Sequence, residues 1–196
     1  YWIGEKIYKK WFLEKIRGFL SEDESNKMKV DGSLIFDPDV LVGFVSGNDP
    51  IFEEYKEIIG SFHLTPAEAY AKFCEKNDIT CSTENLSVVA YILPISQKTK
   101  KENLEYSKDM PGERWAHTRL FGEQANQKLQ KYLAGELKKE AGVNAVAPMT
   151  QGYMFRIHRK HAKGVWASSW SHRHMAFATG LGSFGLSDGF INEKGI

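Results

Sequence analysis

Two short stretches of continuous apolar sequence constrain the fold more than any other feature of the chain. The first, SVVAYIL at Ser87–Leu93, is ended by Pro94, and the second is NAVAP at Asn144–Pro148. Strands in which apolar residues do not alternate with polar ones are usually covered on both faces of their sheet. The pattern therefore predicts a central sheet that contains both stretches and is flanked by helices.

The helices of this α/β (α+β) chain are expected from apolar spacing and from their end signals. A long helix is predicted over Arg114–Ala141 and is closed by Gly142. Apolar residues at helical spacing also run over Tyr1–Leu20 and Ile51–Ile59. The sequence Thr-Pro-Ala-Glu combines an N-cap, a proline in the first turn and a capping box, so a further helix is expected over Thr65–Lys76.

The structure of the remaining segments is predicted from shorter sequence patterns. Val40–Val45 is a candidate strand, whereas Lys98–Glu113 is polar, contains a glycine and is interpreted as a loop. Gly152–Ser169 is irregular and basic, and Ser171 should cap a short helix that reaches Thr179. GFINEKG at Gly189–Gly195 resembles a strand that enters a turn without a returning partner, which suggests that the chain is truncated at its C-terminus.

Composition favours one compact unit. Within this unit, a helical region at residues 1–80 is expected to pack on a core at residues 81–196. The chain has 196 residues, 42% of them hydrophobic, and 26 Lys and Arg against 25 Asp and Glu. A net charge of +1 provides no global field for nucleic acid or membranes, and the longest apolar run is too short to span a bilayer. Cys74 and Cys81 are interpreted as reduced residues of a cytoplasmic protein, since two cysteines cannot hold a zinc or an iron–sulfur cluster alone.

A glycine-rich segment near the end of the sequence has the spacing of a dinucleotide-binding loop. GLGSFG at Gly180–Gly185 matches G-x-G-x-x-G, which binds a pyrophosphate where it follows a strand and begins a helix. Here a predicted helix comes first and a predicted strand follows, so the order is reversed. Helix capping and a tight turn explain one or two of these glycines, and close approach of the backbone to a large flat ligand is the alternative.

The sequence around these glycines resembles a known family. RHMAFATGLGSFGLSDGFINEKG, from Arg173 onward, is similar to the segment shared by epoxyqueuosine reductases and corrinoid-dependent reductive dehalogenases. The resemblance extends at lower strength from Glu84 to the end of the sequence. It implies a nitroreductase-like layered α/β sandwich that binds cobalamin, followed by a domain with two [4Fe–4S] clusters that this chain lacks.

The resemblance also implies a reaction and a binding site. Electrons from clusters downstream of this chain, delivered by a donor such as ferredoxin or flavodoxin, would reach cobalt, and Co(I) would reduce a small molecule or a modified nucleoside, with tRNA as a further partner. Carried over residue by residue, the cofactor would lie against the glycine segment. The residues that would line the cofactor site are Gly180, Leu181, Gly182, Ser183 and Gly185.

This chain differs from the family at the position of the proton donor. Epoxyqueuosine reductases have an aspartate just before the glycine-segment helix, and Trp166 occupies the nearest position here. Tyr153, His172 and His174 are the neighbouring groups able to donate a proton instead. The sequence does not rank them.

A basic segment upstream supplies candidate anion contacts. FRIHRKHAKG, at Phe155–Gly164, is interpreted either as a solvated loop or as an anion clamp in which Arg159 and Lys160 bind a cofactor phosphate or tRNA. Arg173 is expected to form an ion pair or to contact the edge of the cofactor. Two histidine pairs lie nearby, but no third and fourth ligand stand at zinc spacing, so no metal site is assigned.

Two other functions remain open on the sequence alone. One is a corrinoid-binding module without catalytic activity. The other is a flavin-binding protein of the nitroreductase type, because that fold also holds FMN.

Overall fold

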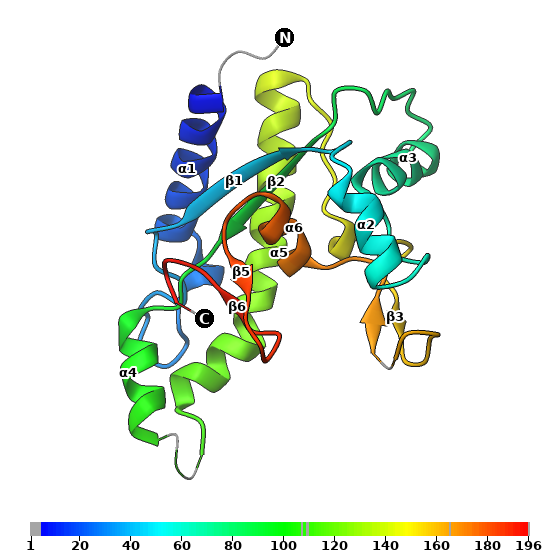
Figure 1. The fold of residues 1–196 in the computed structure, drawn as a ribbon. Coiled ribbons are helices and arrows are strands. Elements are labelled where there is room, and N and C mark those ends of the chain that lie inside the picture. The colour runs from blue at the N-terminus through cyan, green and yellow to red at the C-terminus, as the bar shows by residue number, and fades with distance from the viewer. Residues whose placement is uncertain (1–4, 107, 109, 165, 196) are drawn as a thin grey trace. The chain divides into compact units, whose positions relative to one another are not determined.

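The structure is a computed structural model that describes residues 5–106, 108, 110–164 and 166–195, with side chains from residue 9 onward. It is a mixed α/β protein (Figure 1). The helices are α1 (Glu5–Glu22), α2 (Ile51–Ile58), α3 (Pro66–Lys76), α4 (Gln97–Tyr106), α5 (Glu113–Ala141) and α6 (His172–Ala178), with 3-10 turns η1 (Glu24–Asn26) and η2 (Pro148–Thr150). The strands are β1 (Leu41–Ser46), β2 (Ser87–Ile92), β3 (Ile157–His158), β4 (Ala167–Ser168), β5 (Ser183–Phe184) and β6 (Phe190–Ile191). The first four residues of the predicted N-terminal helix lie outside the described residues.

The chain divides into two compact units, and each unit contains two separate stretches of sequence. The first comprises residues 1–42 and 91–142, and the second comprises residues 43–90 and 143–196. The boundary expected near residue 80 does not coincide with this division. No helix within the described residues is both long enough and apolar enough to cross a membrane.

The first unit is built on α5, which confirms the predicted long helix. Gly142 follows it with a φ of 66°, the left-handed conformation in which glycine carries no Cβ penalty, and its N–H donates to Leu137 and Lys138. α1 packs against α5. Ile16 and Leu129 are both fully buried, so the apolar stripes of the two helices contribute to a common core.

The loop predicted at Lys98–Glu113 is wrong over most of its length, because α4 begins at Gln97. The Ser96 hydroxyl accepts a hydrogen bond from the N–H of Thr99, whose side chain is fully buried, and the rest of α4 is largely polar and exposed. Two side chains of α4 cap the next helix. Asn103 and Glu102 accept hydrogen bonds from the N–H groups of Gly112 and Arg114, so they cap the N-terminus of α5.

Only one of the two apolar stretches forms a strand. Ser87–Ile92 forms β2, as predicted, and pairs with β1, which confirms the strand expected near Val40–Val45. The second prediction is wrong, because residues 144–147 form no strand and Pro148 begins η2. Pro148 lacks an N–H for a sheet, and the carbonyl of Ala147 accepts from the N–H and hydroxyl of Thr150 instead.

The second unit contains α2, α3, α6 and two small hairpins around one apolar cluster. Its buried members come from both stretches of the unit: Phe52, Tyr55, Ala69, Val88, Met154, Trp170 and Met175. α2 and α3 form close to the predicted positions. The Thr65 capping box is present in both directions, since Thr65 accepts from the N–H of Glu68 and Glu68 accepts from the N–H of Thr65.

The prediction that both cysteines are reduced is wrong in this structure, because Cys74 and Cys81 are joined by a disulfide. The chain turns back directly after α3, where Asp78 has a φ of 52° and the N–H of Ile79 donates to the carbonyl of Cys74. This turn brings the two Cα atoms within 6.2 Å of each other, which is the separation that a disulfide requires.

Candidate functional site

The glycine segment follows α6, and its first glycine ends that helix. Ser171 caps the start, where its hydroxyl accepts from the N–H of His174. At the other end Gly180 has a φ of 73°, and the N–H groups of Gly180 and Leu181 donate to Phe177 and Ala176. This is the double hydrogen bond of a Schellman motif, so the C-terminal glycine predicted from the sequence is confirmed.

The next two glycines are required by a hairpin. β5 pairs antiparallel with β6, and both lie beside α6 in Figure 1. A Cβ on Gly182 would overlap the carbonyl oxygen of Ile191 and the ring of Phe190, and a Cβ on Gly185 would lie 2.9 Å from the Ile191 side chain. The helix-before-strand order excludes a dinucleotide-binding loop, as expected. β6 also has a partner strand, contrary to the unpaired edge expected from the sequence.

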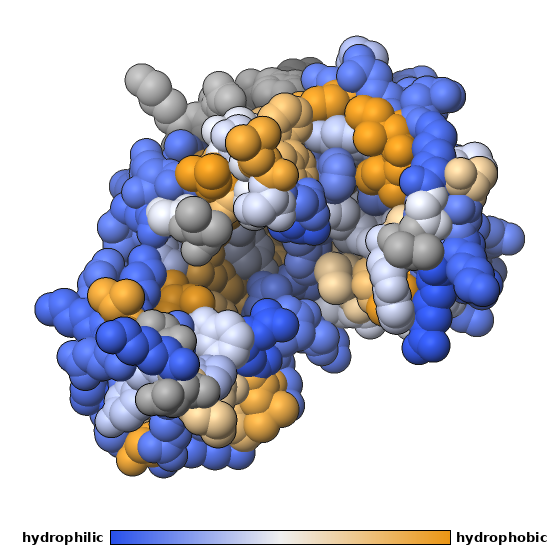
Figure 2. All heavy atoms as spheres, turned by 60° about the horizontal axis from the view of Figure 1, so that its bottom comes forward, coloured by the Kyte–Doolittle hydropathy of each residue, from blue (hydrophilic) through white to orange (hydrophobic). Residues whose placement is uncertain are grey.

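Apolar and polar side chains are both exposed around α6 and this hairpin. A Cβ built on Gly180 meets nothing within 4 Å. Phe177 is 40% exposed, Ile191 is 43% exposed and the side chain of Leu186 is fully exposed. Figure 2 shows apolar side chains exposed among hydrophilic ones on one face of the molecule. These three exposed apolar side chains lie within residues 177–191, and they make this surface a candidate for binding.

Arg173 connects α6 to the turn of the hairpin. Its guanidinium forms an ion pair of 2.9 Å with the Asp188 carboxylate and donates a second hydrogen bond to the Asp188 carbonyl. It also lies 5.7 Å from the centre of the Phe184 ring. The sequence left two roles open for Arg173, and the structure gives it the ion pair.

His174 lies in a cluster of rings on the inner side of α6. Its ring centre is 4.8 Å from that of Tyr55 and 4.9 Å from that of Phe184, and the Tyr55 hydroxyl donates to the His174 carbonyl at 3.0 Å. Burial, together with the nearby His63 and Arg173, lowers the pKa of His174 to about 4. The imidazole is therefore neutral near neutral pH.

His63 completes this cluster and was not identified from the sequence. It is 1% exposed, and its ring centre lies 5.9 Å from that of His174. Its Nδ1 lies 3.0 Å from the Ser168 carbonyl, which can only accept, so Nδ1 carries the proton and Nε2 holds a lone pair. Within the described residues Nε2 has no hydrogen-bond partner. Burial is the main cause that lowers the pKa of His63.

The other two candidate proton donors differ in exposure. Tyr153 is 37% exposed, and burial raises the pKa of its hydroxyl, so it keeps its proton at neutral pH. His172 is half-buried at the first position of α6.

The basic segment forms a second hairpin, from β3 and β4. Arg159 and Lys160 are exposed in it, and the Arg159 guanidinium lies 5.4 Å from the centre of the exposed Trp166 ring. Phe62 stacks on His158 with ring centres 3.9 Å apart. The structure thus brings His174, Arg173 and the glycine segment together, and records no contact between them and Arg159 or Lys160 among the described side chains.

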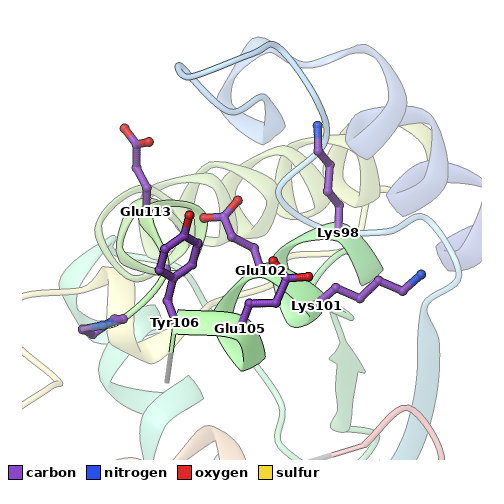
Figure 3. Close-up of a pocket in the computed structure, with 8 residues that line it drawn as sticks. Lys98, Lys101, Glu102, Glu105, Tyr106 and Glu113 are labelled. Atoms are coloured by element: carbon purple, nitrogen blue, oxygen red, sulfur yellow. The ribbon is translucent and has the colours of Figure 1, made fainter. Parts of the chain in front are cut away.

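A separate pocket of 570 Å³ lies in the first unit between α4 and the start of α5 (Figure 3). Most of its lining is charged: Lys98, Lys101, Glu102, Glu105 and Glu113, with Tyr106, Pro111 and Gly112. Glu102 is paired with Arg114 at 3.1 Å and Lys98 with Asp31 at 2.8 Å. A lining with this many charged side chains does not suit a large apolar cofactor.

No protein-family model, curated protein or solved structure matches the chain. Within the described residues, no group of three or more His, Cys, Asp or Glu side chains is arranged to hold a metal ion. The candidate site therefore rests on the residues around α6 and the β5–β6 hairpin.

Proposed function

We propose that the second unit binds cobalamin against α6 and the β5–β6 hairpin, as part of a reductase of the epoxyqueuosine reductase or reductive dehalogenase type. The observation that carries the proposal is the exposed apolar surface of Phe177, Leu186 and Ile191 beside the open backbone of Gly180. This surface lies in the same segment whose sequence resembles that family.

The residues fit one edge of a corrinoid. A corrin ring is broad and flat, and its apolar face needs apolar contacts while its amide-bearing rim needs hydrogen-bond partners. Ser183 is exposed and offers a hydroxyl, and Arg173 lies at the side of the same surface. Gly180 and Leu181 would lie against the ring by their backbone. Gly182 and Gly185 are already covered by the hairpin, so their part in the site is to hold β5 close to β6.

Bound cobalamin would supply a cobalt ion that passes electrons to an organic substrate, while the protein binds, orients and protonates. Tyr153 is the favoured proton donor of the three candidates, because it retains its proton and is exposed. His174 is a poor acid near neutral pH, since its pKa of about 4 leaves the imidazole without the acidic second proton. His172 remains the second choice.

The fold, electron source and substrate that we propose are those implied by the family resemblance. The second unit would belong to a nitroreductase-like sandwich. Electrons would come from [4Fe–4S] clusters that are not in this chain and from a donor such as ferredoxin or flavodoxin. The substrate would be a small molecule or a modified nucleoside, with tRNA as a further partner.

A visible spectrum tests the proposal against its flavin alternative. The chain is incubated with equimolar hydroxocobalamin and FMN, and free ligand is removed by gel filtration. We expect corrinoid absorption to remain with the protein. Flavin absorption alone would favour an FMN protein, and a colourless protein would contradict both.

The assignment of Arg159 and Lys160 to the cofactor phosphate makes a separate prediction. Arg159→Ala with Lys160→Ala should weaken hydroxocobalamin binding by about 1.5 kcal/mol, or roughly tenfold, because charge-assisted hydrogen bonds to the nucleotide tail are lost. Calorimetric titration measures the change. Cobinamide, which lacks the phosphate, is the control, and its affinity should not change. An unchanged affinity for hydroxocobalamin would remove both residues from the cofactor site.

A further inference from the structure

The Cys74–Cys81 disulfide closes a short loop of the second unit at the end of α3. Cys74 lies in the last turn of α3, and Cys81 lies in the connection between α3 and β2, residues 77–86. Both neighbouring elements contribute to the buried cluster of this unit, α3 through Ala69 and β2 through Val88. The disulfide is therefore a covalent link between the connection and a helix of the core.

The connection is otherwise held mainly by hydrogen bonds. Each of its residues is exposed or half-buried, so it adds no fully buried side chain to the core. The Nδ2 of Asn48 donates to the carbonyls of Thr83 and Glu84 at 2.8 and 3.3 Å, and the N–H of Gly47 donates to the carbonyl of Leu86. Segments with few buried apolar contacts and exposed hydrogen bonds open most easily. The disulfide is thus the strongest anchor of the connection.

The two cysteines differ in how a dissolved thiol can reach them. Cys74 is 3% exposed, whereas Cys81 is half-buried, so a thiol reaches Cys81 first. Burial and the negative end of the helix dipole both disfavour a thiolate at Cys74. In the reduced chain Cys81 is therefore expected to be the more reactive thiol.

The turn that brings the cysteines together has hydrogen bonds of its own. The N–H of Ile79 donates to the carbonyl of Cys74 at 3.0 Å, and the side-chain amide of Asn77 donates to the carbonyl of Phe73 at 2.7 Å. These bonds direct the chain back towards Cys74 whether or not the sulfur atoms are joined. The disulfide can therefore re-form without refolding of the unit.

We propose that Cys74 and Cys81 form a reversible thiol–disulfide switch that controls the order of the α3–β2 connection. A dithiol supplies the two electrons. Its thiolate attacks Sγ of Cys81, the bond to Cys74 breaks, and Cys74 leaves as a thiolate that takes up a proton. The second thiol of the dithiol then displaces Cys81 from the mixed disulfide. The dithiol leaves as its own disulfide, and both cysteines are reduced.

The closed form of the connection is the oxidised one. Reduction returns chain entropy to the loop and leaves only hydrogen bonds to hold it, so the connection opens while α3 and β2 stay in place. This inference goes beyond the proposed function and does not depend on it, because its residues lie outside α6 and the β5–β6 hairpin.

The first test compares the reactivity of the two thiols. Cys74→Ser leaves only Cys81, and Cys81→Ser leaves only Cys74, since the chain has two cysteines. Labelling of each native variant with a maleimide dye measures the rates, and circular dichroism verifies that each variant is folded. We expect Cys81 to react at least about tenfold faster than Cys74. Equal rates in two folded variants would overturn the proposed order of attack.

The second test measures amide hydrogen exchange of the full wild-type chain, oxidised and then reduced with dithiothreitol. We expect the amides of residues 80–85 to exchange at least about tenfold faster after reduction and those of β2 to change by less than about twofold. Oxidised glutathione should restore the slow exchange. Cys74→Ser with Cys81→Ser is the control, and it should exchange at the reduced rate under both conditions.

Three results of this second test would overturn the switch. One is exchange of residues 80–85 that does not change on reduction. Another is a disulfide that dithiothreitol does not reduce in the folded chain, which would make it a permanent link. The third is a reduced chain whose two thiols stay free in oxidised glutathione.

Discussion

Lowering the pH from about 7 to about 4 is expected to reduce the free energy of unfolding by about 1–2 kcal/mol through His174, because solvent around this half-buried ring screens part of the effect. The pKa of this histidine is about 4 in the folded chain and 6.5 as its ordinary value. His63 should add to the effect, since its pKa is also lowered. The loss should be centred on the second unit, which contains both residues.

The direction of this pH dependence follows from proton uptake on unfolding. Between the two pKa values the unfolded chain binds a proton at His174 that the folded chain does not, so stability rises with pH in this window. The contribution is complete above about 6.5 and is lost as the pH falls towards 4. The neighbouring charges are Arg173, which lowers the pKa of His174, and Asp188, which raises it. For His63, Lys56 lowers the pKa and Glu68 raises it.

Urea unfolding followed by tryptophan fluorescence at several pH values measures this dependence. A slope of up to about 1.4 kcal/mol per pH unit is expected for each proton taken up. His174→Gln should reduce the slope, whereas His161→Gln, outside the cluster, is the control and should leave it unchanged. If both variants keep the wild-type slope, the histidine pair is not the acid-sensitive element.

Gly182→Ala is expected to destabilise the second unit by about 3 kcal/mol, because its methyl group would overlap the Ile191 carbonyl and the Phe190 ring. Backbone cannot move aside as a flexible side chain can, so β5 would have to separate from β6. A loss of cofactor binding in such a variant would therefore report a damaged hairpin and not a lost contact to the ligand.

Gly152→Ala is the matched control for this substitution. A Cβ at Gly152 meets nothing within 4 Å, so its unfolding free energy should stay within about 0.5 kcal/mol of the wild type. Thermal unfolding of both variants makes the comparison. Equal stability of Gly182→Ala and the wild type would show that the hairpin does not pack as described.

The elements predicted well from the sequence are those whose signals are local. The capping box at Thr65 and the glycine after Ala141 act through hydrogen bonds within a few residues, so they specify their helices without tertiary contacts. The same holds for Ser171 and Gly180, which bound α6. The β-branched and aromatic residues of Ser87–Ile92 favour a strand in the same way.

The elements that were missed depend on distant partners. α4 has no apolar stripe that would mark it as a helix. Its contribution to the fold comes from Glu102 and Asn103, which cap the N-terminus of α5. NAVAP has the composition of a strand, but Ala147 directs its carbonyl to Thr150. No local pattern marks His63, whose position is defined only by its packing near His174 and its hydrogen bond to Ser168.

The central claim is that α6 and the β5–β6 hairpin bind a corrinoid, and calorimetric titration of the full chain with hydroxocobalamin tests it most directly. We predict saturable binding with one ligand per chain, and weaker binding when the exposed Leu186 is replaced by Asp, because a charge would then face the apolar ring. Leu104→Asp, at an exposed leucine of the first unit, is the control and should bind like the wild type. Absence of binding by the wild-type chain, or equal binding by the Leu186 variant, would contradict the assignment.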